Sequence, residues 1–196
     1  MKLLFLLFLL YNSLLAQDNY SVRFAYGKAS QNDLGDIISG NLGSHPNDLK
    51  VYALDGGYLL RESEILPLYI KSSFSYFDED GVSDLYEATL YLKLYYHIPY
   101  LHKVLRFGFG EGVSYTSKYL QCEYLEAQEK EDKNSKILNY IDISLDIDVG
   151  RLVGSKTFYG TYVGYALKHR SGIFGLINNV KKGGSNYNTL YIEKNF

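Results

Sequence analysis

The sequence has no tryptophan, one methionine and one cysteine among its 196 residues. Because Cys122 has no second cysteine to pair with, an intramolecular disulfide is excluded, and we expect this side chain in an exposed loop. The chain has 20 basic and 22 acidic residues, a balance that argues against a nucleic-acid partner. Beyond the first residues, no second apolar run is long enough for a membrane helix.

The amino terminus has the pattern of an export signal. A basic residue is followed by an apolar run from Leu3 to Leu10 and by small residues at Ser13 and Ala16. This pattern predicts a cleaved secretory signal peptide over residues 1–16. The alternative is a retained anchor helix, which needs about 20 apolar residues. Residues 17–196 have the length of a single domain.

Apolar and polar residues alternate in about eight segments, and the chain is rich in tyrosine (21) and glycine (18). This composition suits strands with aromatic belts. In "SKILNYIDISLDIDVG", Ile141, Ile143 and Leu145 share one face, while Asp142 and Asp146 lie on the other. Each segment spans about ten residues, roughly what a tilted strand needs to cross a bilayer. No segment has a convincing helical period.

A soluble β-sandwich would also alternate, but three features favour a membrane barrel. The segments are longer than the usual five or six residues of soluble strands. Short connections alternate with long ones, and the long ones lie near residues 28–47, near residues 119–134 and after Ser171. The chain also ends on an aromatic residue, Phe196. We therefore predict an all-β fold, an eight-stranded antiparallel transmembrane β-barrel of the bacterial outer membrane. A barrel of that size has a lumen filled by side chains.

The predicted lumen carries charges of both signs that can neutralise one another, and we assign them a structural role. The inward positions are Arg23, Lys71, Lys93, Arg106 and Lys168 against Asp55, Glu87, Asp142, Asp146, Asp148 and Glu193. Glu111 is the exception, because strict alternation points it at lipid. A bulge in "GFGEG" would turn it inward.

A catalytic pattern lies at the end of the seventh segment, "TFYGTYVGYALKHRSG". Its odd positions are apolar and face lipid, so His169 and Ser171 continue the outer face at the lip of the barrel. Aligning the last strand by its periplasmic end sets Asn186 opposite His169. The three side chains supply a hydroxyl nucleophile, an imidazole base and an amide that orients the ring. Nearby glycines, including Gly172 and Gly175, offer backbone N–H groups for an oxyanion.

The last thirty or so residues resemble the PagL-type lipid A 3-O-deacylases, whose pattern is His-x-Ser-Asn, a glycine-containing loop and a final strand. The matching stretches are "HRSG" and "GGSNYNTLYIEKNF". The resemblance implies Ser171 as nucleophile and His169 as base, with no metal cofactor. It departs at Gly172, where the family has asparagine, and at Asn186, where the family typically has glutamate; Glu111 is an alternative acid.

The resemblance implies an outer-membrane serine esterase that removes the 3-O acyl chain from lipid A in lipopolysaccharide. Tyr165 and Leu167 are expected to contact the acyl chain, and Arg170 to meet anionic groups together with Lys181 and Lys182. The expected partner is lipid A in the outer leaflet, and a homodimer stays open. A non-catalytic barrel with partner-binding or membrane-stabilising loops is the alternative function, and a conduit for apolar solutes is a third.

Overall fold

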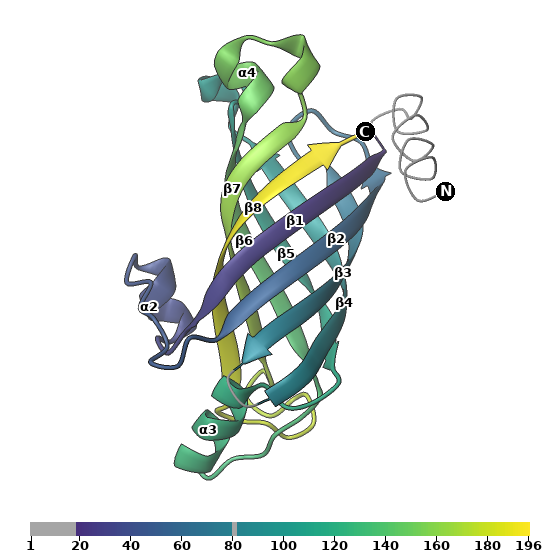
Figure 1. Cartoon of the computed structure of the whole chain (residues 1–196). Coiled ribbons are helices and arrows are strands. Elements are labelled where there is room, and N and C mark those ends of the chain that lie inside the picture. The colour runs from purple at the N-terminus through teal and green to yellow at the C-terminus, as the bar shows by residue number, and fades with distance from the viewer. Residues whose placement is uncertain (1–18, 80–81) are drawn as a thin grey trace, which may run out of the picture.

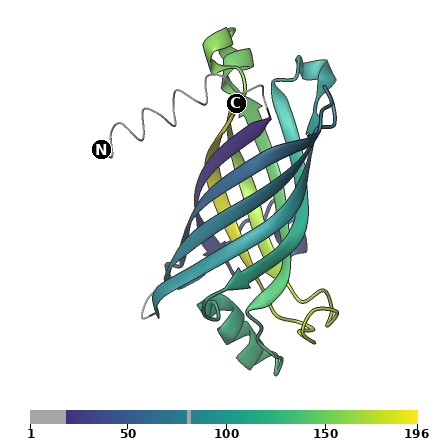
Figure 2. The same cartoon turned by 90° about the vertical axis from the view of Figure 1, so that its right-hand side faces the viewer.

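The computed structural model describes residues 19–79 and 82–196, and the predicted signal peptide over residues 1–16 lies outside them. Eight antiparallel strands close into one barrel in which every strand pairs with its sequence neighbours and β1 pairs with β8 (Figures 1 and 2). The strands are β1 (Tyr20–Ser30), β2 (Lys50–Arg61), β3 (Leu68–Glu79), β4 (Val82–His97), β5 (Leu105–Thr116), β6 (Ile137–Asp148), β7 (Thr161–Ser171) and β8 (Gly184–Asn195). The predicted fold is confirmed.

The outer wall of the barrel is apolar on nearly every strand. Phe24 on β1, Phe74 on β3 and Leu190 on β8 are 50%, 58% and 69% exposed. Water would penalise such a continuous apolar surface, whereas lipid hydrocarbon accommodates it. Closure pairs the backbone groups that hydrocarbon could not hydrogen-bond. The strands therefore turn their apolar faces to a membrane.

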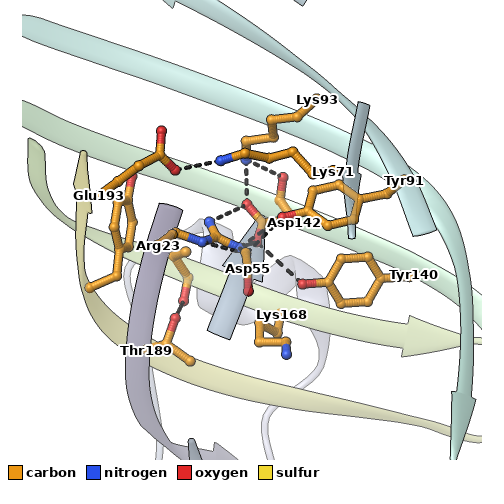
Figure 3. Close-up of polar contacts among 12 residues, drawn as sticks. Arg23, Asp55, Lys71, Tyr91, Lys93, Tyr140, Asp142, Lys168, Thr189 and Glu193 are labelled. Carbon is orange, nitrogen blue, oxygen red and sulfur yellow. Dashed lines mark hydrogen bonds and ion pairs between the residues drawn. The ribbon is translucent and has the colours of Figure 1, made fainter. Parts of the chain in front are cut away.

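The lumen is filled by buried side chains that form an ion-pair network (Figure 3). Arg23 binds Asp55 and Asp142, and Lys93 also binds Asp142. Lys71 lies 2.5 Å from Glu193, which also accepts from Arg106. These side chains are at most 1% exposed, so the predicted inward set is confirmed. Every acid in the network has a cation within contact, as burial of charge requires.

Short helices lie in the connections, so the expectation of no helix was wrong there. They are α2 (Leu34–Ile38), α3 (Gln121–Glu129) and α4 (Val149–Val153), with 3-10 turns η1 (Pro99–Leu101) and η2 (Lys156–Phe158). In Figure 1, α3 lies at the end of the barrel opposite the carboxyl terminus, and α2 lies outside the wall beside β1 and β8. No helix in the described ranges is both long and apolar enough to cross a membrane.

Helix α3 covers the end of the lumen that lies opposite α4 (Figure 1). Leu120 and Cys122 join an apolar cluster with Phe77 and Tyr187 from the barrel and with Leu49, which directly precedes β2. Cys122 is only 8% exposed, and its sulfur lies 3.7 Å from the Tyr187 hydroxyl. The prediction of an exposed cysteine was therefore wrong, because the β5–β6 connection folds inward over the barrel mouth.

Candidate functional site

The predicted site residues His169, Ser171 and Asn186 lie on the outer wall, within two adjacent rows of paired positions that run across the strands. The first row is Glu111, Ile141, His169 and Asn186, one residue from each of β5 to β8. The second row is Val113, Asn139, Ser171 and Gly184. Because alternate residues of a strand share a face, both rows point away from the lumen. The predicted pairing of His169 with Asn186 is observed.

His169 and Asn186 are joined by a hydrogen bond whose direction follows from a second contact. Asn186 Nδ2 donates to the Asn32 carbonyl at 2.9 Å, so the amide oxygen must face the ring. That oxygen lies 2.8 Å from His169 Nδ1 and can only accept. Nδ1 therefore carries the proton, and a neutral imidazole keeps a free lone pair on Nε2. The loop between β1 and β2 thus selects the tautomer that a general base needs.

A cavity of about 630 Å³ lies over these residues. It is bounded by the barrel wall, the β1–β2 connection, α3 and the β7–β8 loop. The lining includes Leu34, Glu111, Glu126, Lys130, Asn139, Ile141, His169, Ser171, Gly172, Phe174, Lys181, Lys182, Gly184 and Asn186. His169 and Ser171 share the cavity without a hydrogen bond between them in the described part of the chain. Catalytic hydrogen bonds often tighten only when substrate binds.

A second, more polar cavity of about 460 Å³ lies beside the first. The two share Asp33, Glu126, Lys130, Gly184 and Asn186, so they meet at the amide that holds His169. The second is also lined by Gln31, Asn32, His45, Asn47 and Glu129. A molecule with one apolar and one polar end could occupy both at once.

Four of the residues named from the sequence lie elsewhere than expected. Arg170 faces the lumen and is 3% exposed, with Nη1 2.8 Å from Glu123 Oε1, so it cannot meet a ligand outside. Leu167 lies on the outward face of β7, as predicted, but it is covered and only 2% exposed. Tyr165 donates to Asn188 Oδ1 at 2.5 Å and lies outside the cavity lining. The Gly175 N–H donates to the Gly172 carbonyl at 3.2 Å, so it is not a free oxyanion donor.

The burial of Leu167 has a visible cause. Asn188, its partner across β8, donates to the Leu42 carbonyl at 2.9 Å. The connection carrying Leu42 and α2 therefore lies on the outer wall over this part of the barrel (Figure 1). The segment was predicted to be a long outer loop, and its folding back onto the wall forms one side of the cavity.

Three carboxylates, those of Asp33, Glu111 and Glu126, line the cavity with His169. The register of β5 is unbroken against both neighbours at Glu111, so no bulge turns this side chain inward. Glu111 is two strands away from His169, with Ile141 between them. Glu126 on α3 accepts from the Gly184 N–H at 3.0 Å and pairs with Lys130. Glu126 and Leu34 were missed from the sequence, because their connections reach the site only through tertiary folding.

Glu123 on α3 is buried against the barrel mouth, where burial raises its pKa from about 4.5 to about 7 despite the neighbouring Arg170. A raised pKa means that docking of α3 is most favourable below about pH 4.5 and weakens as pH rises through 7. Hydrogen exchange of the α3 amides, corrected for intrinsic rates, is expected to show this loss of protection. Glu123→Gln should flatten the pH profile; an unchanged profile would contradict the assignment.

The closed barrel and its apolar belt define a small outer-membrane β-barrel protein. No family model and no curated protein matches the chain. Among solved structures, Neisserial surface protein A is similar over 92% of this chain and 98% of its own, with 12% identity and a TM-score of 0.50. The amino-terminal barrel of Pseudomonas aeruginosa OprF (13% identity; 91% and 98% covered; TM-score 0.49) and Yersinia pestis Ail (8%; 90% and 99%; 0.47) also match. The likeness to Neisserial surface protein A supports the fold, and with the apolar belt it assigns the chain to the bacterial outer membrane.

Proposed function

We propose that the protein is an outer-membrane serine esterase that releases the 3-O acyl chain of lipid A. The observation that carries the proposal is the His169–Asn186 hydrogen bond of 2.8 Å, which holds the imidazole with Nε2 unprotonated in the cavity that Ser171 also lines. The resemblance of the last thirty residues to PagL-type deacylases supports the same roles.

The proton transfers of the proposed reaction use Ser171, His169 and water. His169 Nε2 takes the Ser171 hydroxyl proton while the serine oxygen attacks the ester carbonyl. When the tetrahedral intermediate collapses, the sugar oxygen leaves with the proton from His169. Water, deprotonated by the same imidazole, then hydrolyses the acyl-serine. The Asn186 amide orients the ring but brings no negative charge to offset the imidazolium, so we expect slower turnover than with a carboxylate.

The position of the cavity favours a lipid ester over a soluble one. The cavity lies against the outward face of the barrel wall, and its lining includes Leu34, Ile141 and Phe174 beside the polar residues. Lys181 and Lys182, on the β7–β8 loop at its edge, are exposed and can meet sugar phosphates. The adjoining polar cavity has the lining that a hydroxyl-rich head group needs. Lipid A combines these features in one molecule.

Mass spectrometry of lipid A tests the proposal directly. Cells of a Gram-negative host with fully acylated lipid A would express the wild type, Ser171→Ala or an empty vector. We expect a lipid A species lacking one 3-O-linked hydroxyacyl chain only with the wild type. Purified protein mixed with lipid A in detergent micelles repeats the test free of any restraint in the native membrane. Unaltered lipid A in both settings would reject the esterase and favour a non-catalytic barrel.

A further inference from the structure

The oxyanion donor is the part of the site that the sequence leaves open. The family's asparagine after the serine is Gly172 here, and the N–H of Gly175 is already bonded. On one side of Ser171 the paired residue on β8 is Gly184, which has no side chain. On the other side the paired residue on β6 is Asn139. Side chains of directly paired residues have Cβ atoms about 4.5–5.5 Å apart, within reach of an amide.

Asn139 combines burial with an unused donor. Its side chain is 5% exposed and lines the same cavity as His169 and Ser171. Its Nδ2 has no hydrogen-bond partner among the described residues. A buried donor without a partner costs free energy, and asparagine is disfavoured within strands. Its outward neighbours on β6, Ile137 and Ile141, are aliphatic, as a lipid-facing strand requires. A polar residue here therefore needs a purpose other than packing.

We infer that Asn139 is a catalytic residue whose Nδ2–H stabilises the oxyanion formed during ester cleavage. The assignment rests on the proposed esterase function. As Ser171 Oγ bonds to the carbonyl carbon, the carbonyl π electrons move to its oxygen, and Asn139 donates to that negative charge. When the carbonyl re-forms, the charge disappears and the sugar oxygen leaves with the proton from His169. Since Nδ2 has no hydrogen-bond partner in the described part of the chain, rotation about the terminal torsion of Asn139 can aim the N–H at this oxygen.

The decisive variant is Asn139→Leu, which has nearly the same size and removes the unpaired donor. We expect kcat on a lipid A or p-nitrophenyl acyl ester substrate to fall by about 10²–10³-fold, with KM nearly unchanged. Resistance to unfolding should stay equal or rise, because no polar group is left buried without a partner. A purely structural asparagine would not separate activity from stability in this way. Asn139→Ala should lose the same activity, and reaction of Ser171 with a fluorophosphonate should slow in both variants.

Val113→Ala is the matched control, since Val113 pairs with Asn139 from β5 but lies outside the cavity lining. Its kcat should equal that of the wild type. Ser171-dependent turnover that stays within threefold in Asn139→Leu would overturn the assignment and leave the esterase standing. A wild type with no Ser171-dependent hydrolysis would remove the proposed function and the assignment together. The outcomes therefore separate the two claims.

Discussion

Ser171→Ala and His169→Ala are each expected to lower kcat by about 10⁴-fold or more on lipid A in micelles, and the double variant should be no slower than either. The reason is that the two side chains act in one step. Without His169 the serine hydroxyl keeps its proton, and without Ser171 the imidazole has no nucleophile to activate. Initial rates of fatty-acid release over a range of lipid A concentrations provide the measurement. KM should change little, because neither group is part of the apolar surface that holds the acyl chain.

Ser155→Ala is the matched control for the serine change. Ser155 lies at the opposite end of the barrel before η2, and its side chain makes no capping hydrogen bond. Its turnover should equal that of the wild type. Folding of every variant can be checked by the shift in electrophoretic mobility between unheated and heated samples. Single variants whose effects multiply in the double variant would contradict a shared step, as would a folded Ser171→Ala protein with turnover near the wild-type rate.

The barrel could be predicted from the sequence because two environments enforce the same period. Lipid selects apolar residues such as Ile143 on one face of β6, and the lumen selects charged residues such as Asp142 on the other. The alternation therefore persists along whole strands. Helix α3 could not be predicted in this way. Its Glu123 is buried because Arg170, 47 residues away, lies beneath it in the lumen. The sequence pattern around Glu123 gives no information about a partner that is so distant in the chain.

The site was predictable where it depends on strand geometry and not where it depends on loops. Parity placed His169 and Ser171 on the outer wall, and the register placed Asn186 beside the imidazole. The Asn32 carbonyl that fixes the amide comes from a segment more than 150 residues away. The same alternation that points His169 and Ser171 outward points Arg170 into the lumen. The prediction that Arg170 contacts the substrate was therefore wrong. The catalytic roles themselves remain predictions.

The second large effect is on stability and concerns Asp142, the acid at the centre of the lumen network (Figure 3). Its carboxylate accepts from Arg23 Nη2 at 2.6 Å and also binds Lys93 Nζ. Asp142→Ala leaves both cations buried with one acid fewer, and loss of one partner from a buried ion pair costs about 3–5 kcal/mol. We expect the urea midpoint to fall accordingly. Circular dichroism in detergent is the suitable probe, because the chain has no tryptophan to report by fluorescence.

Asp48→Ala provides the contrast, because Asp48 pairs with Lys28 and Lys50 at the exposed rim, where solvent screens the interaction. No measurable shift in the midpoint is expected there. If uncompensated charge causes the loss, then removing one stranded cation should restore part of it, and the double variant Asp142→Ala with Lys93→Met should unfold at higher urea than Asp142→Ala alone. An equal or lower midpoint in the double variant would show instead that the loss comes from the cavity left in the packing. The network would then stabilise the barrel by filling its lumen rather than by pairing its charges.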